Sequence, residues 1–179
     1  MCYIDRMDKY INIVKGVRKH NAQAQMMFYD FFVRRVFLSS YSITGDENEA
    51  EEIAQDTMLK VFEKPDLLHD DAVAMERILK RIAINAAINV MRRRKDFVFS
   101  VDEIPDIEDP EIEEDNLYFS VEEVKKAVTS LSDSYRTILS LRLFGEMSFS
   151  GISELLNVKC STVRVQYMRG ITKLKHLLL

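Results

Sequence analysis

The sequence of 179 residues has no tryptophan, only two cysteines, three prolines and five glycines. Because proline and glycine are the main helix breakers, their scarcity favours a helix-rich protein. Cys2 and Cys160 stand far apart in the sequence, and the three histidines show no metal-ligand spacing with them. We therefore expect no disulfide framework, no metal and no cofactor, in a protein of the reducing cytoplasm.

The sequence also lacks the patterns of membrane insertion, secretion and catalysis. No apolar run approaches the roughly 20 residues that span a bilayer, and the first residues lack the basic-then-apolar order of a signal peptide. The glycines are isolated from one another, so they form no phosphate-binding loop. No nucleophile with a general base and an orienting group is recognisable. The sequence thus predicts a cytoplasmic protein without membrane insertion and without enzymatic activity.

Charge is segregated along the chain, although the net charge of −4 argues at first against a nucleic-acid partner. Residues 77–95 contain seven lysines and arginines and no acid, whereas residues 102–115 contain nine acids and no base. Local fields rather than the net charge decide what a surface attracts. The basic segment is therefore a candidate for nucleic-acid binding, with an ordinary basic helix end as the alternative.

Helical periodicity occurs in two stretches of the chain, separated by a segment that lacks it. Residues 1–95 predict a helical N-terminal domain, and residues 120–179 predict a helical C-terminal domain. Residues 96–119 contain two prolines and the acidic run, and they predict a flexible acidic linker. The predicted fold class is all-α, with two small helical domains and a helix-turn-helix in the second.

One helix of the N-terminal domain is predicted over residues 47–64, with a turn and a cap at Thr44-Gly45-Asp46. Its apolar positions predict the inner face, namely Ala50, Ile53, Ala54, Thr57, Val61 and Phe62. Pro65 is expected to end this helix, and a polar loop is predicted from Pro65 to Val73. A further helix is expected to follow and to end at Arg92–Lys95.

Residues 148–179 have the pattern of a helix-turn-helix, with helices from Ser148 to Leu156 and from Ser161 to the end. The apolar face of the second helix comprises Val163, Tyr167, Gly170, Ile171, Leu174 and Leu178. The opposite stripe, expected to face outward, comprises Arg164, Val165, Met168, Arg169, Thr172 and Lys175. Because no acid follows Glu154, we expect this stripe to contact DNA rather than to be an ordinary solvated face.

Two sets of residues, in the same order along the chain, resemble those of one known family. The C-terminal set is Ala127–Ser132, Arg136, Leu139–Arg142, Met147–Phe149, Ile152-Ser153, Leu155-Leu156, Ser161–Arg164 and Arg169. The N-terminal set is Gly45-Asp46, Glu49–Ile53, Gln55–Thr57, Val61-Phe62, Leu79, Arg81–Ala83, Asn85, Ala87–Asn89 and Arg92–Arg94. Together they resemble bacterial RNA polymerase sigma factors of the sigma-70 family, and most closely the extracytoplasmic-function (ECF) group, over residues 22–179.

The resemblance implies a promoter-specificity subunit whose partners are core RNA polymerase, at its clamp and flap, promoter DNA and an anti-sigma factor. The implied contacts to the upstream (−35) element are Ser161, Thr162, Arg164, Val165, Met168 and Arg169. The implied contacts to the opened downstream (−10) element, besides the Pro65–Val73 loop, are Arg81, Asn85, Asn89, Arg92, Arg93, Arg94 and Lys95. The implied clamp-docking residues are Glu49, Glu52, Gln55 and Asp56. The acidic linker is either a segment that threads the polymerase or a passive tether.

The sequence departs from the family pattern at several positions. Met75, Ile78 and Lys80 stand where the family has aromatic residues, and Val165-Gln166 replaces a frequent Ser-Arg pair. Aromatic stacking contributes about 1–3 kcal/mol per unpaired base in single-strand binders. Two alternatives therefore remain open at this point: a sigma-like decoy that binds polymerase without promoting transcription, and a stand-alone helix-turn-helix regulator.

Overall fold

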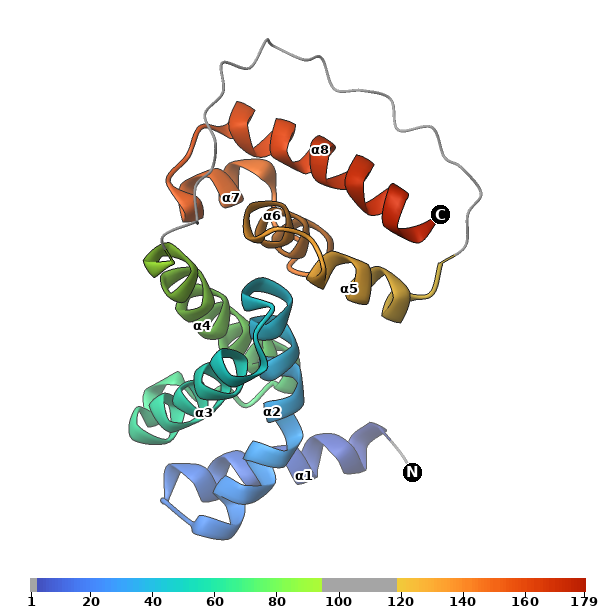
Figure 1. Ribbon diagram of the computed structural model, residues 1–179. Helices are drawn as coiled ribbons and strands as arrows, with labels where there is room; N and C mark the ends of the chain where they lie inside the picture. Colours follow the sequence, from blue (N-terminus) through green and yellow to red (C-terminus); the bar gives the residue numbers. More distant parts are fainter. Residues whose placement is uncertain (1–2, 95–118) are drawn as a thin grey trace. The chain divides into compact units, whose positions relative to one another are not determined.

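The computed structural model describes residues 3–94 and 119–179, and helices form almost all of this part of the chain (Figure 1). The α-helices are α1 (Tyr3–Arg18), α2 (Ala22–Thr44), α3 (Glu47–Glu63), α4 (Ala72–Arg93), α5 (Val121–Thr129), α6 (Asp133–Leu143), α7 (Phe149–Leu156) and α8 (Cys160–Leu178). A short 3-10 helix, η1 (Pro65–Leu67), precedes α4. The all-α prediction is confirmed. The linker predicted over residues 96–119 falls almost wholly outside the described residues.

The described chain forms two compact units. The first comprises residues up to Tyr41 together with Asp46–Asn89, and the second comprises Ser42–Gly45 together with residues from Val90 onward. The first unit thus contains α1, α3, most of α2 and most of α4. The second unit contains α5 to α8.

The core of the first unit is an aromatic and aliphatic cluster on α2. Phe28 and Phe32 are fully buried, with ring centroids 4.8 Å apart. Side chains from the other helices of this unit are also fully excluded from solvent, namely Val14, Val17, Ala50, Val61, Met75, Leu79 and Ala83. The burial of so many large apolar side chains supplies the main driving force for folding this unit.

The predicted start of the 47–64 helix is confirmed. Asp46 caps α3, because its carboxylate accepts a hydrogen bond from the Glu49 backbone N–H at 3.0 Å. Gly45, with a φ of 66°, turns the chain in the left-handed region that glycine adopts without strain. The inner face is also as predicted, apart from Phe62, which is half-buried, while Met58 is an additional buried residue.

The loop after α3 is shorter than predicted. Pro65 ends α3 and begins η1, but α4 already begins at Ala72, so Val73 lies in a helix. The side chain of Asp71 explains this difference, since it accepts a hydrogen bond from the Val73 N–H at 3.0 Å, as a helix-capping residue does. The segment between α3 and α4 is therefore residues 64–71, which include η1.

In the second unit, α8 packs against α5, α6 and α7. Its core contains Val128, Leu131, Leu139 and Leu174. Gly170 allows the close approach of α8 to α6, because a Cβ at this position would lie 3.2 Å from Leu139 Cδ1. In the predicted C-terminal helical domain, the part before the helix-turn-helix is divided into α5 and α6 by a break at residues 130–132. Ser120 begins α5 with a capping box, in which it exchanges hydrogen bonds with Glu123.

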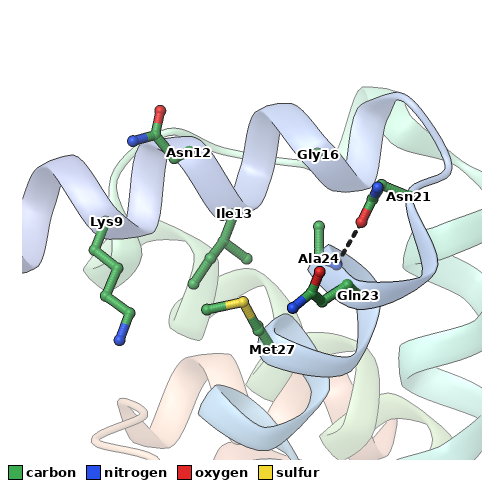
Figure 2. Close-up of a pocket in the computed structure, with 8 residues that line it drawn as sticks. All are labelled: Lys9, Asn12, Ile13, Gly16, Asn21, Gln23, Ala24 and Met27. Atoms are coloured by element: carbon green, nitrogen blue, oxygen red, sulfur yellow. Dashed lines mark hydrogen bonds between the residues drawn. The ribbon is translucent and has the colours of Figure 1, made fainter.

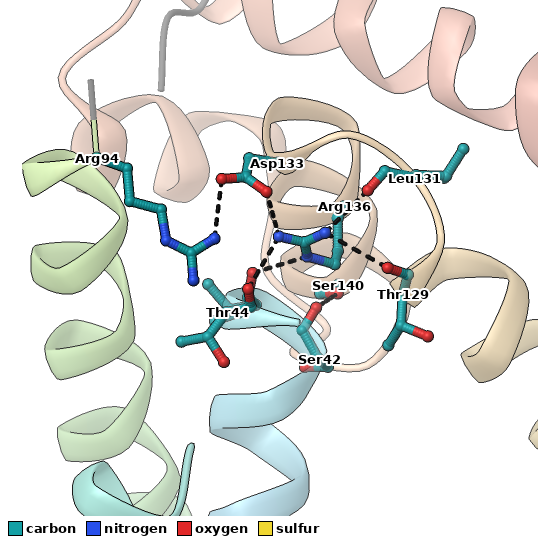
Figure 3. Close-up of polar contacts among 9 residues, drawn as sticks. Ser42, Thr44, Arg94, Thr129, Leu131, Asp133, Arg136 and Ser140 are labelled. Atoms are coloured by element: carbon teal, nitrogen blue, oxygen red, sulfur yellow. Dashed lines mark hydrogen bonds and ion pairs between the residues drawn. The ribbon is translucent and has the colours of Figure 1, made fainter. Parts of the chain in front are cut away.

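At this break, the buried side chain of Arg136 donates hydrogen bonds to backbone carbonyl oxygens of the second unit (Figure 3). Arg136, only 6% exposed, donates to the carbonyl oxygens of Leu131 at 2.9 Å and Thr129 at 3.4 Å. It pairs with Asp133, which also accepts from Arg94 at 2.9 Å. Because a buried charge is costly unless it is paired and hydrogen-bonded, this set of acceptors is what allows the guanidinium to lie in the interior.

The same guanidinium also satisfies the backbone of the short segment Ser42–Gly45. It donates to the carbonyl oxygens of Ile43 at 3.0 Å and Thr44 at 2.9 Å, while Ser140 donates to the carbonyl of Ser42. A Cβ at Gly45 would lie 2.7 Å from Arg136 Cζ. Gly45 is therefore required both by its φ and by the space that the arginine occupies.

We predict that Arg136→Met lowers the free energy of unfolding by about 2–3 kcal/mol, because it leaves several buried carbonyl oxygens without a donor. Urea unfolding followed by far-ultraviolet circular dichroism measures the change. Lys126→Met, which removes an exposed cation from α5, serves as the control and is expected to change stability by no more than about 0.5 kcal/mol. Equal stability of the two variants would contradict the role given to Arg136.

Candidate nucleic-acid interface

The turn between α7 and α8 is a compact helix-turn-helix connection. Asn157, with a φ of 56°, ends α7 in the left-handed conformation that asparagine tolerates better than most residues. Ser153 and Val158 then exchange two hydrogen bonds, from the Val158 N–H at 3.1 Å and from the Ser153 hydroxyl at 2.6 Å. The helix-turn-helix predicted from the sequence is confirmed, with α7 and α8 at the predicted places.

The apolar face predicted for α8 is also confirmed. Val163, Gly170 and Leu174 are buried, and Tyr167, Ile171 and Leu178 are partly buried against the same core. On the opposite side, Ser161, Arg164 and Arg169 are exposed, and Met168 is half-buried. These exposed residues include both arginines of the stripe that was expected to contact DNA.

Two residues of the predicted DNA-contacting set are buried instead. Val165 is 6% exposed, so the prediction that it lies on the outward stripe is wrong, and Thr162, a candidate phosphate contact, is only 3% exposed. The physical reason is that α7 as well as α6 packs on α8, which widens its buried face beyond the single stripe that the apolar period indicates. Gln166, at 2% exposed, is buried for the same reason.

An aromatic side chain at the start of α7 gathers two arginines. The Cζ atom of Arg142 lies 5.0 Å from the centroid of the Phe149 ring, and that of Arg164 lies 5.9 Å from it. Tyr167 packs edge-on against the same ring, with centroids 5.3 Å apart. Arg142 is further held by a hydrogen bond to the Met147 carbonyl at 3.2 Å.

Sequence reasoning identified Arg164 but missed Arg142 and Phe149 as members of this cluster. The three residues come from α6, α7 and α8, and no periodicity within one helix connects them. The one available signal was the resemblance, whose matching residues include both Arg142 and Phe149 without assigning them a role.

The candidate residues for the opened strand lie on α4. Arg81, Asn85 and Asn89 are exposed and follow one another at intervals of four residues, so they share one face of the helix. Arg77, also exposed, extends this stripe by a further turn. The structure thus brings together, on one helix face, three of the seven residues that the sequence indicated for the −10 element.

The four basic residues at the end of α4 behave differently from one another. Arg92 donates to the carbonyl of Leu155 at 2.7 Å, and Arg94 forms the ion pair with Asp133. Both therefore have partners within the second unit. Arg93 is exposed, and Lys95 lies outside the described residues.

Three of the four candidate docking residues are exposed on α3, namely Glu52, Gln55 and Asp56, whereas Glu49 is half-buried. Gln55 also lines a groove of about 330 Å³ between α3 and α2. The side chains that α2 contributes to this groove are Tyr29, Val33, Arg34 and Phe37. An apolar floor with a polar rim is the anatomy of many protein-binding surfaces.

In the described ranges, His, Cys, Asp and Glu side chains nowhere gather in a group of three that would hold a metal ion. Within the same ranges, no helix combines the length and hydropathy needed to cross a membrane.

Comparison with known proteins gives two matches to family models. Residues 29–97 match the model of sigma-70 region 2, and residues 122–174 match that of sigma-70 region 4. A stand-alone helix-turn-helix regulator would not explain the match to region 2. The predicted resemblance is thereby confirmed over both halves of the chain.

Individual relatives agree with these models. The chain is 27% identical to the ECF RNA polymerase sigma factor SigW of Bacillus subtilis, over 88% of this chain and 90% of that protein. It is 29% identical to SigE of Mycolicibacterium smegmatis, over 86% of this chain and 62% of that protein. The sigma factor RpoE of Bartonella quintana, solved in complex with the anti-sigma factor NepR, has a similar fold, with a TM-score of 0.50, 20% identity and coverage of 82% and 91% of the two chains. The chain belongs to the sigma-70 family, in its ECF group, and directs RNA polymerase to specific promoters.

Proposed function

We propose that the two units divide promoter recognition between them, so that α8 reads the duplex −35 element and the first unit holds the opened −10 strand. In this proposal α3 docks on the polymerase clamp, and residues 96–119 connect the two DNA-binding regions. The observation that carries the proposal is the pair of exposed arginines on α8, on a helix-turn-helix whose second helix contains no acid.

Three exposed residues of α8 form the proposed −35 surface. Arg164 and Arg169 supply guanidinium groups, each of which is able to bind a phosphate or two acceptors on a guanine edge. Ser161 lies in the first turn of the helix, where unpaired backbone N–H groups favour a phosphate. Thr162 and Val165 are buried and have no part in this surface.

Phe149 contacts both Arg142 and Arg164, with cation–ring distances of 5.0 and 5.9 Å. The electron-rich face of an aromatic ring attracts a cation placed over it. Each guanidinium is thereby ordered before DNA arrives, so less side-chain entropy is lost on binding. We assign Arg142 to the phosphate backbone beside the helix that reads the bases.

The exposed stripe of Arg77, Arg81, Asn85 and Asn89 on α4 forms the proposed −10 surface. The stripe belongs to the acid-free segment 77–95, and Glu76, the acid that precedes it on α4, is paired with Lys80 at 2.7 Å, so its charge is partly offset where a phosphodiester strand would lie. The side-chain amide of each asparagine is able both to donate hydrogen bonds to unpaired bases and to accept hydrogen bonds from them. The segment 64–71 supplies the loop in which an unpaired base is held.

Glu52, Gln55 and Asp56 on α3 form the proposed docking surface, together with the groove against α2. Their acidic character fits a basic partner surface. The groove contributes apolar contact from Val33 and Phe37.

Regulation by an anti-sigma factor is part of the proposal, because the similar RpoE chain was solved in complex with one. We further propose that the protein acts in the cytoplasm, where core RNA polymerase is found, and that it has no catalytic activity of its own. Initiation would then depend on sequestration and release of the sigma factor.

Transcription with core RNA polymerase and a library of random promoter DNA tests the proposed function. We expect the wild-type chain to bind core polymerase and to enrich two sequence elements among the transcribed templates. A chain that binds core polymerase but yields no promoter-specific transcript is the decoy, and that result would overturn the proposal. The enriched sequences supply the promoter for the variants below.

We predict that Phe149→Leu weakens binding of holoenzyme to promoter DNA about five-fold, the size of one cation–π contribution, without changing its salt dependence. Both arginines remain in this variant, so the number of phosphate contacts is unchanged. Arg142→Gln is the matched variant, and we expect it to reduce the slope of log affinity against log salt by about 0.9. Fluorescence anisotropy of a labelled promoter duplex over a salt series measures both quantities. Equal slopes in Arg142→Gln and wild type would exclude the phosphate contact.

We predict that Arg169→Ala weakens promoter use by about 1–3 kcal/mol and relaxes selectivity at one position of the −35 element, if the guanidinium pairs with a base. Lys173→Ala, another exposed cation on α8, controls for the loss of charge. Footprinting and transcript yield report the effect. An unchanged footprint would remove the base contact from Arg169.

We predict that Glu52→Lys weakens association with core polymerase by at least about ten-fold, because it places a cation on an acidic docking surface. Glu122→Lys makes the same charge change at an exposed site on α5 and is expected to leave the affinity unaltered. Competition with labelled wild-type chain for core polymerase measures the two affinities. Similar losses in both variants would indicate a net-charge effect and refute the assignment to α3.

A further inference from the structure

The helix α1 contacts the loop that precedes α4, although the two are separated by about 50 residues of sequence. The helix lies before the residues that match the region 2 model, 29–97, so no role is assigned to it by that match. The loop, residues 64–71, is the segment proposed above to hold an unpaired base. Two side chains of α1, Tyr10 and Arg18, make the contacts.

Tyr10 is a fixed donor to the loop backbone. Its ring is buried, with 3% exposed, and its hydroxyl donates to the carbonyl oxygen of His69 at 2.8 Å. Burial raises the pKa of the Tyr10 hydroxyl well above its usual range, and Asp70 and Asp71 raise it further. The hydroxyl therefore keeps its proton at any physiological pH and remains a donor.

Arg18 makes a two-part contact with the same loop. One guanidinium nitrogen lies 2.9 Å from the Asp70 carboxylate, and another donates to the Leu68 carbonyl at 3.1 Å. Asp66, Asp70 and Asp71 make this loop acidic and are all exposed. Since a phosphodiester strand carries negative charge, neutralising Asp70 reduces the repulsion that the strand meets at the loop.

The carbonyl oxygens of Leu68 and His69 accept hydrogen bonds from side chains of α1. Within the loop, the Leu67 N–H donates to the Lys64 carbonyl oxygen, and the Leu68 N–H donates to that of Pro65. The His69 N–H donates to the Met75 sulfur at 3.4 Å. Leu68 is buried and anchors the segment to the core. Arg18 and Tyr10 of α1 thus supply the hydrogen-bond donors for the Leu68 and His69 carbonyl oxygens.

The last turns of α1 approach α2 closely at Gly16 and Ala24, beside the pocket of about 300 Å³ between the two helices that Figure 2 shows. A Cβ at Gly16 would lie 2.5 Å from the Cβ of Ala24, so the two helices approach as closely as small residues permit. Asn21 begins α2 by accepting a hydrogen bond from the Ala24 N–H at 2.9 Å. Val14 and Val17, both fully buried, add apolar contact. A helix fixed in this way is able to hold a loop in one conformation.

We propose that Tyr10 and Arg18 are positioning residues that fix the conformation of the loop 64–71 and thereby set base selectivity at the −10 element. This inference rests on the proposed function of the loop. Neither residue is required to touch DNA, because both act through the Leu68 and His69 backbone and the Asp70 carboxylate. The downstream element alone is affected, since α8 and its cations belong to the other unit.

Selection of promoters by holoenzyme tests the proposal. The probe is a duplex library with a fixed −35 element, taken from the wild-type selection, and a randomised −10 region. We expect Tyr10→Phe and Arg18→Gln each to reduce the preference at one or more −10 positions by about five-fold, the size of one lost hydrogen bond to a buried or charged group. Selectivity in a second library, with a fixed −10 and a randomised −35 element, is expected to be unchanged.

Lys15→Gln is the matched control, because it also removes one cation from α1 but Lys15 is exposed and has no contact with the loop among the described interactions. Affinity for core polymerase and thermal unfolding are measured for each variant. An Arg18→Gln variant with wild-type −10 preference, or a Lys15→Gln variant with the same loss, would overturn the proposal. Equal losses at both promoter elements would also overturn it, since they would indicate general destabilisation.

Two further results separate this inference from the function on which it rests. If wild-type holoenzyme enriches no −10 sequence, the proposed function of the first unit fails. If wild type enriches a −10 sequence but the variants select it equally well, only the role of α1 fails. Should Tyr10→Phe not fold, Arg18→Gln decides the question, because its side chain is 40% exposed and its loss leaves the core intact.

Discussion

The buried guanidinium of Arg136 is the interaction on which the second unit depends. It satisfies the carbonyl oxygens at the end of α5 and in the turn before α6, and so determines where α6 begins. The helix α6 then provides the surface on which α8 lies, with Gly170 close to Leu139. The direction of the exposed arginines of α8 thus depends on a cation that is almost wholly buried, because burial of one face of α8 decides which side chains remain on the other.

Among the described residues, several arginines of α4, α6 and α8 have different tasks. Arg136 and Arg94 hold the fold through Asp133. Arg142 and Arg164 are ordered by the Phe149 ring. Arg77 and Arg81 remain exposed on α4. Counting basic residues would not separate these groups, because the distinction lies in what each side chain touches.

Much of this structure follows from apolar periodicity. The inner face of α3, its cap at Asp46 and the apolar face of α8 were all predictable, because each depends on spacing within one helix. The burial of Thr162 and Val165 was not, since it depends on α7 packing beside α6 on the same helix. The break between α5 and α6 was missed for a similar reason: the turn at residues 130–132 is held by hydrogen bonds from Arg136 rather than by proline or glycine.

Contacts between distant residues were the least predictable. Phe149 gathers arginines from two other helices, and Tyr10 reaches a carbonyl 59 residues away. No pattern in one dimension encodes such distances. The family resemblance indicated which residues matter in the C-terminal set, but it left the side-chain partners of Arg142 unassigned.

The close contact at Gly16 has a genetic consequence. A methyl group there would collide with Ala24, so even alanine would force α1 away from α2 and shift the helix that carries Tyr10 and Arg18. In a screen for altered promoter choice, lesions are commonly sought near the DNA-facing helices. Here the geometry adds a position on α1, occupied by the smallest amino acid, whose substitution would shift the donors to the loop 64–71.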